Sequence, residues 1–306
     1  ISTDQLLTTS SHEISLYIVI KALIAPGDKV VVATPSYYLP NMTLSNCGAQ
    51  IISVPIEDDG ISTHQLKKVL QDHKIRILYL TSNYHYPTTN VLSATKRMEI
   101  LELARLHDFV VVEDDYEYDF HHDNNPLLPL AALDANERVV YISSFGKSLP
   151  SGFAYGFITA PSNFIIELEK HLNILEPGTD VIKEQVITEW IKDGEVHRLA
   201  KKNRKIYTER RDHFVLLLAE KFKERIQFKT PSRGLAVWVE WLDDINLVKL
   251  QKECAKYGLF LPTTILYQNK NLRATRLGFG HLEKTEMDEV LKVLRKALSG
   301  CFADRS

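Results

Sequence analysis

A lone lysine near the middle of the chain has neighbours that suit a reactive amine. The apolar run Val139-Val140-Tyr141-Ile142 precedes it, and small residues surround it in Ser143-Ser144-Phe145-Gly146-Lys147-Ser148-Leu149-Pro150-Ser151-Gly152. Burial lowers the pKa of a lysine, and the neutral amine can then attack an aldehyde to form a Schiff base. Because G-K and K-S pairs are also common in solvated turns, this stretch alone leaves both interpretations of Lys147 open.

Carboxylates follow a second apolar run, upstream of the lysine. Phe109-Val110-Val111-Val112 leads directly into Glu113-Asp114-Asp115-Tyr116. A buried parallel strand that ends in acids places them at the carboxyl edge of a sheet, where open α/β folds bind ligands. Alternate strand residues point to opposite faces, so only one of Asp114 and Asp115 can face such a ligand. Proteins supply three such groups to pyridoxal phosphate: an acid for the protonated ring nitrogen, a lysine for the aldehyde, and a tyrosine.

These motifs resemble those of the fold-type-I aminotransferases, most of all the aminotransferase-like domain of MocR-type transcriptional regulators of the GntR family. The regulators read roughly T-F-S-K-x-L-x-P-G-x-R-x-G-Y around the lysine and E-D-D-Y after the strand. Their loop H-Q-Y-P-T-G is similar to Tyr84-His85-Tyr86-Pro87-Thr88-Thr89. Ordinary aminotransferases usually carry N-P-T-G there, so this loop favours the regulators. The resemblance covers nearly the whole chain.

The resemblance implies cofactor roles for five residues. Lys147 would hold pyridoxal 5'-phosphate as a Schiff base and move the proton of an amino substrate. Asp114, in preference to Asp115, would keep the pyridine nitrogen protonated, and Tyr116 would bond the ring hydroxyl. Tyr37 matches the aromatic residue that stacks on the ring, and Tyr86 lies in the loop that contacts the cofactor.

Further residues would hold the phosphate and the substrate. Ser11 and His12 open an apolar helix whose first amides form an anion site, and Ser144 would face the same phosphate. A capped helix without a ligand is the alternative at this position. Arg276, in Arg276-Leu277-Gly278-Phe279, matches the family arginine that grips an amino-acid carboxylate, whereas Arg273 does not match.

Three positions depart from the family pattern. Ala154 stands where the family has an arginine seven residues after the lysine, and Thr89 and Ser10 stand where it has glycines. The loss of a charge-assisted contact at Ala154 predicts weaker binding of the phosphate. Ala154 and Thr89 keep open a third possibility, a degenerate relative that has lost the cofactor.

Strands and helices alternate along the first part of the chain, as in a parallel sheet covered on both faces. Strands are expected at residues 29–33, 50–55, 76–81, 109–112, 139–142 and 157–160. Helices are expected at residues 14–23, 62–71, 93–107, 161–175 and 179–193. Met98, Leu101 and Ala104 form the expected apolar stripe of the third helix. Residues 1–7 are expected to approach a helix from within a longer protein.

The fold class predicted is therefore α/β, a doubly wound and mostly parallel sheet, which the resemblance identifies as the type I PLP-dependent transferase fold. A smaller α+β domain follows, with strands at 235–240 and 273–277 and helices at 247–257 and 284–298. We expect a large cofactor-binding domain at 1–195, a long linking helix at 196–225 and the small domain at 226–306.

Composition narrows the class of protein. The 306 residues are 44% hydrophobic and 25% charged, enough for a large core, and the formal charge of -2 gives no electrostatic footprint for nucleic acid. Cys47, Cys254 and Cys301 are scattered, so reduced thiols and a cytoplasmic location are expected. No apolar run reaches membrane-spanning length, and His121-His122 lacks the second ligand group that a metal site needs.

Two functions of different classes fit these residues. One is the effector-sensing part of a transcriptional regulator, in which exchange of the cofactor between Lys147 and an amino compound changes the conformation. The other is a free-standing aminotransferase that acts on an amino acid. Both predict an amino acid or amine as ligand and a homodimer. DNA would be bound only through an N-terminal region that this chain does not include.

Overall fold

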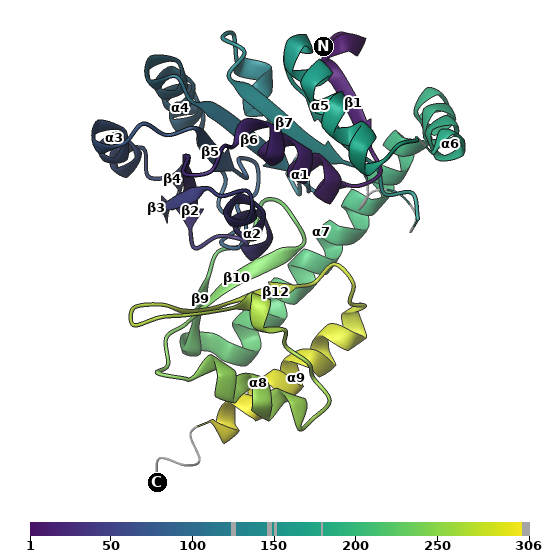
Figure 1. Ribbon diagram of the computed structural model, residues 1–306. Helices are drawn as coiled ribbons and strands as arrows, with labels where there is room; N and C mark the ends of the chain where they lie inside the picture. The colour runs from purple at the N-terminus through teal and green to yellow at the C-terminus, as the bar shows by residue number, and fades with distance from the viewer. Residues whose placement is uncertain (124–126, 146–148, 150–151, 179, 302–306) are drawn as a thin grey trace. The chain divides into compact units, whose positions relative to one another are not determined.

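Among the residues that the structure describes, eight strands form one sheet in the order β1-β8-β7-β6-β5-β2-β3-β4 (Figure 1). The structure is a computed structural model, and it describes residues 1–123, 127–145, 149, 152–178 and 180–301. Five neighbouring strands run parallel: β2 (Lys29–Thr34), β3 (Gln50–Glu57), β5 (Ile77–Leu80), β6 (Val110–Asp115) and β7 (Val139–Ser144). The antiparallel strands are β1 (Leu6–Thr9), β4 (Gly60–Ile61) and β8 (Gly156–Thr159).

Helices cover both faces of this sheet, as the alternating pattern predicts. On one face, α1 (His12–Leu23) and α5 (Ser162–Leu175) share a buried cluster with β-strand residues such as Val112 and Ile142. On the other face, α3 (Thr63–Asp72) and α4 (Ala94–His107) pack with Val111 and Val139. Successive residues of β6 and β7 therefore face different helices. The remaining elements are α2 (Tyr38–Asn46), α6 (Val181–Lys192) and the 3-10 helices η1 (Thr3–Gln5) and η2 (Leu130–Leu133).

The chain divides into two compact units. The first takes residues 1–86 and 90–203, and the second takes residues 87–89 and the chain from Arg204 on. The long helix α7 (Glu195–Phe222) begins in the first unit and ends in the second. The expected domain ends at residues 195 and 225 stay predictions.

The second unit has its own sheet and core. Its antiparallel strands follow the order β11-β12-β10-β9, and α7, α8 and α9 supply residues to one buried cluster with them. The bounds are β9 (Ile226–Phe228), β10 (Ala236–Trp241), α8 (Leu247–Ala255), β11 (Leu266–Gln268), β12 (Arg273–Gly278) and α9 (Lys284–Gly300). Two 3-10 helices, η3 (Lys223–Arg225) and η4 (Thr263–Ile265), complete the unit. No helix among the described residues is both long enough and apolar enough to cross a membrane.

Two expectations about these elements are wrong. Residues 1–7 do not simply lead into a helix, because Leu6 and Leu7 belong to strand β1, which pairs with β8. The stripe of α4 is also different, because Met98 is 58% exposed while Arg97 is only 2% exposed. Leu101 and Ala104 are buried as expected, so Arg97 occupies the position on that face that the sequence pattern gave to Met98.

Candidate active site

Asp114 lies near the end of β6 on the face that α1 covers, and it is 3% exposed. His12 Nε2 lies 3.1 Å from Oδ1 and 3.2 Å from Oδ2, and the Tyr79 hydroxyl donates to Oδ2 at 2.6 Å. Oδ1 is buried and accepts no hydrogen bond from the described residues. A buried carboxylate oxygen with spare acceptor capacity suits a protonated ring nitrogen.

Asp115 faces the opposite side of the sheet. Asn83 Nδ2 donates to its Oδ2 at 2.5 Å, and the Tyr141 hydroxyl donates to the same oxygen at 3.2 Å. Burial, together with the nearby charge of Glu113, raises the pKa of Asp115 to about 7. The two adjacent acids thus have different surroundings, and the preference for Asp114 as the partner of a ring nitrogen stays a prediction.

Aromatic rings from the loops after β2 and β5 lie together near β6, the strand that carries Asp114 and Asp115. The rings of Tyr37 and Tyr86 lie 4.4 Å apart between centroids at an angle of 44°, and Tyr38 packs edge-on against Tyr37 at 4.9 Å. Burial and the neighbouring tyrosines raise the pKa of Tyr37 to about 12, so its hydroxyl is neutral at ordinary pH. Tyr116 is half-buried, and its ring lies 6.4 Å from that of His12.

His85 ties the two loops together. Its Nε2 lies 2.9 Å from the carbonyl oxygen of Pro35, and its Nδ1 lies 3.1 Å from the Thr81 hydroxyl. Burial lowers the pKa of His85 to about 4, so the ring is neutral at pH 7. A carbonyl only accepts, so Nε2–H donates to Pro35, two residues before Tyr37, and Nδ1 accepts from Thr81.

The expected phosphate site consists of the capped start of α1 and of strand β8, which approaches the turn before that helix closely. Ser11 is the N-cap of α1, and its hydroxyl oxygen accepts from the amide of Ile14. A Cβ on Gly156 would lie 2.5 Å from the Ser11 carbonyl oxygen, so only glycine lets β8 pack against this turn. Ser10 donates from both its amide and its hydroxyl to the carboxylate of Glu176. Ser144 ends β7 and is half-buried.

Two further residues were predicted for this site. Lys147 lies outside the described residues. Arg276 belongs to the second unit, where it is half-buried on β12 opposite Trp238 of β10. Arg273, the less likely candidate for the substrate arginine, pairs with Asp244.

Sequence reasoning missed the partners of Asp114. The sequence assigns a role only to the amide of His12 and places Tyr79 within a strand. Tyr79 carried a weak signal: it is the one residue with a polar group in the run Ile77–Leu80, and burial together with the Asp114 charge raises its pKa. A buried tyrosine hydroxyl usually has a hydrogen-bond partner.

The family description "Aminotransferase class I and II" matches residues 2–294. The chain belongs to this family. A solved kynurenine aminotransferase of Pyrococcus horikoshii, in complex with PMP, is 26% identical, with a TM-score of 0.90 over 98% of this chain and 76% of that one. This likeness confirms the predicted type I PLP-dependent transferase fold.

Relatives in the class I and II family include both enzymes and regulators. Aromatic-amino-acid aminotransferase 1 of Thermococcus litoralis is 26% identical over 97% of this chain and 73% of its own length. The uncharacterized HTH-type transcriptional regulator YdfD of Bacillus subtilis is 23% identical over 94% of this chain and 60% of its own length. Pyridoxal 5'-phosphate is the cofactor that the family implies, and Oδ1 of Asp114, which accepts no hydrogen bond from the described residues, fits its ring nitrogen.

Proposed function

We propose that this aminotransferase-like chain is the effector-sensing part of a MocR-type regulator of the GntR family. The observation that carries the proposal is the loop Tyr84–Pro87, in which Tyr86 packs on Tyr37 where ordinary aminotransferases usually have an asparagine. An aromatic ring at this place extends the stacking surface beside Asp114 and offers no amide to the cofactor. The similarity to HTH-type regulators such as YdfD supports the same assignment.

Pyridoxal phosphate, when bound, supplies an aldehyde for amines and a ring that withdraws electrons from the carbon next to the amine. Asp114 would hold the proton on the ring nitrogen, and His12 with Tyr79 would fix the orientation of its carboxylate. Lys147 would bind the aldehyde and, once released by an amino compound, move a proton. Tyr116 would donate to the ring hydroxyl.

The remaining assigned residues would bind groups at the edges of the site. Tyr37 and Tyr86 would lie against the ring, and Ser144 with the helix start at Ser11 and His12 would donate to the phosphate. Arg276 would bind the carboxylate of an amino acid through its guanidinium fork.

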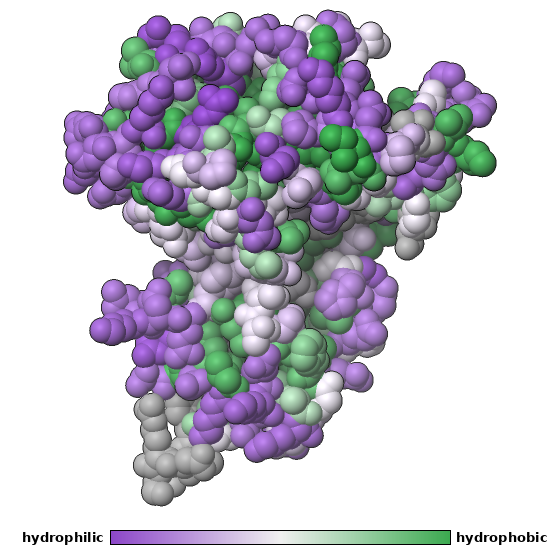
Figure 2. Space-filling model, viewed as in Figure 1, coloured by the Kyte–Doolittle hydropathy of each residue, from purple (hydrophilic) through white to green (hydrophobic). Residues whose placement is uncertain are grey.

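A homodimer is part of this proposal. Several large apolar side chains on α5 and α6 are exposed, and Figure 2 shows hydrophobic side chains over α6. Such exposure is typical of a surface that another chain covers. They are Ile166, Ile174, Val181, Ile182 and Ile191. Sedimentation equilibrium should give twice the chain mass, and a monomer at micromolar concentration would contradict this part of the proposal.

Turnover separates a sensing domain from an enzyme. PLP-loaded protein is mixed with a panel of amino acids and excess 2-oxo acid, and the keto product is counted per chain. A sensing domain should form no more than about one equivalent of keto product per chain, because it is not expected to release and reload the cofactor repeatedly. The coding sequence upstream of Ile1 provides an independent test, since the proposal requires a helix-turn-helix there.

A free-standing aminotransferase is the second candidate. The observation that favours it is the similarity to aminotransferases such as that of Thermococcus litoralis, of which this chain covers 73%. Sustained turnover with one amino acid in the same experiment, lost in Arg276→Ala, would establish it in place of a sensing domain.

A further inference from the structure

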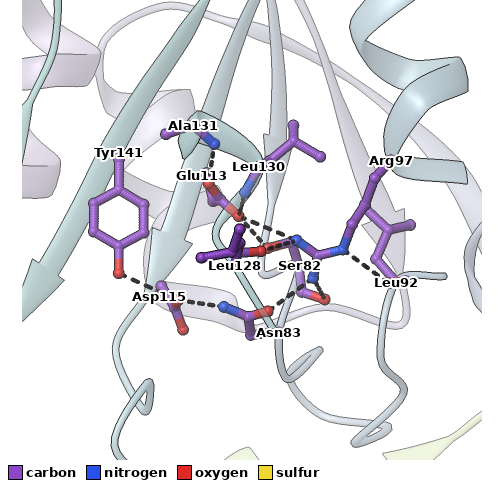
Figure 3. Close-up of polar contacts among 10 residues, drawn as sticks. All are labelled: Ser82, Asn83, Leu92, Arg97, Glu113, Asp115, Leu128, Leu130, Ala131 and Tyr141. Atoms are coloured by element: carbon purple, nitrogen blue, oxygen red, sulfur yellow. Dashed lines mark hydrogen bonds and ion pairs between the residues drawn. The ribbon is translucent and has the colours of Figure 1, made fainter. Parts of the chain in front are cut away.

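The buried guanidinium of Arg97 lies within a network of polar contacts (Figure 3). The network is on the sheet face that α4 covers, whereas Asp114 is on the face that α1 covers. Arg97 of α4 donates to three backbone carbonyls, those of Leu92 at 3.0 Å, Leu128 at 2.9 Å and Ser82 at 3.2 Å. It also donates to the side-chain oxygen of Asn83 at 2.8 Å. One side chain therefore joins α4, the loop after β5 and the segment before η2.

Glu113 provides the balancing charge. It is fully buried, and one of its oxygens lies 4.0 Å from Arg97 Nη1. The Ser82 hydroxyl and the backbone amides of Leu130 and Ala131 donate to the same carboxylate. A buried charge needs both a counter-ion and hydrogen bonds, and Glu113 has both.

The network continues to the strand ends that carry the site. Asn83, held by Arg97 through its oxygen, donates through its nitrogen to Asp115, which also accepts from Tyr141 of β7. The carboxyl ends of β5, β6 and β7 are thus linked by side chains on the α4 face. On the α1 face, the residue next to Asp115 is Asp114, and the loop after β5 continues to Tyr86.

We propose that Arg97 is a positioning residue of the cofactor site, which fixes the loop 82–86 and the end of β6 so that Tyr86 and Asp114 face the pyridine ring. This inference rests on the proposed binding of pyridoxal phosphate. Arg97 acts from behind the sheet and does not itself touch the cofactor. An ammonium group has three donors on one atom and cannot reach four acceptors on separate segments, so lysine does not replace this arginine.

The test compares Arg97→Lys, the charge-neutral pair Arg97→Met with Glu113→Gln, and the control Arg105→Met. Arg105 lies on the same helix, but it is exposed and pairs only with Glu102 among the described residues. Urea unfolding identifies which variants are folded, and the double variant leaves no unpaired charge buried if the single change is too disruptive.

Two measurements are made on each folded variant. Hydrogen exchange of amides 82–86 in cofactor-free protein reports the loop alone, and titration with pyridoxal phosphate gives the affinity and the visible circular dichroism per bound cofactor. The loss of several charge-assisted hydrogen bonds should speed exchange and weaken affinity by roughly ten- to a hundred-fold. Arg105→Met should behave like the wild type in both measurements.

Folded Arg97 variants with wild-type exchange and wild-type affinity would overturn the proposal. Faster exchange with unchanged affinity and dichroism would also overturn it, since Arg97 would then stabilise the loop without affecting the site. Wild-type protein that takes up no pyridoxal phosphate would instead defeat the proposed function, and the exchange data would still show whether Arg97 fixes the loop.

Discussion

Asp115 is a buried acid beside the residue proposed to bind the ring nitrogen. Burial and the Glu113 charge raise its pKa from 3.8 to about 7. Between these two pH values Asp115 is protonated in the folded chain and ionised in the unfolded chain. The unfolded state binds fewer protons between these values, and stability falls as pH rises through that window. Above pH 7 the contribution of Asp115 is constant.

Asp115→Asn should remove this pH dependence. Between pH 5.5 and 8 the wild-type chain should lose roughly 2 kcal/mol more unfolding free energy than the variant, since each pKa unit corresponds to about 1.4 kcal/mol. Urea unfolding at the two pH values measures the difference. Equal losses in both proteins would show that Asp115 is ionised throughout this range.

Thr89 occupies a backbone conformation that favours glycine. Its φ is 64°, and the left-handed region costs an L-residue roughly 1–2 kcal/mol. Thr89→Gly should raise the free energy of unfolding by roughly 0.5–1 kcal/mol, after the entropy cost of glycine is counted. Thr88 is the matched control, since it is not among the residues with positive φ. Thr88→Gly should lower the free energy of unfolding. A lower free energy of unfolding in both variants would contradict the explanation from the φ angle of Thr89.

Charge at the expected phosphate site depends on Ala154 and Glu176. Ala154 is exposed and supplies no cation where the family has arginine, and Glu176 brings a carboxylate to Ser10, two residues before α1. Both features oppose a phosphate group. Ala154→Arg should tighten pyridoxal phosphate roughly ten- to a hundred-fold, and Glu176→Gln should tighten it by a smaller factor.

Equilibrium dialysis at constant ionic strength measures both affinities. Lys170→Gln serves as a control on α5, because Lys170 is exposed and pairs with Glu167. If the wild type already retains the cofactor through exhaustive dialysis and neither change tightens it, another cation holds the phosphate.

At the scale of elements, His85 connects the loop after β2 to the loop after β5. His85→Gln should keep much of the contact with the Pro35 carbonyl, because the amide nitrogen of glutamine can replace Nε2 as donor. His85→Leu should release Tyr37 and lower the affinity for pyridoxal phosphate by roughly ten-fold, the cost of about one buried hydrogen bond. Cofactor titration of both variants checks this. Equal affinities would show that the hydrogen bond from His85 to the Pro35 carbonyl does not position Tyr37.

The parallel strands were predictable because each contains consecutive apolar residues, which are β-branched in runs such as Val30–Val32 and Val110–Val112. Strand β1 was not, because its four residues pair with β8, about 150 residues away, and no local pattern carries such a contact. The acids and tyrosines of the site follow from their places at strand ends. The contacts of His12 and Arg97 depend on how α1 and α4 are rotated against the sheet, which packing decides.

At the scale of the whole molecule, the two units carry different parts of the proposed function. The first unit contains the acid, the aromatic rings and the helix start that would bind the cofactor, and the second contains Arg276. We therefore expect loss of Arg276 to weaken reaction with amino acids and to leave attachment of the cofactor intact, because cofactor capture is assigned to residues of the first unit.

The most direct test of this account is the site at which pyridoxal phosphate attaches. Wild-type protein is loaded with the cofactor and reduced with borohydride, and the labelled peptide is identified by mass spectrometry. The account predicts a single label, on Lys147, and no visible absorbance of bound cofactor in Lys147→Ala. A label on another lysine, with Lys147→Ala still coloured, would contradict it.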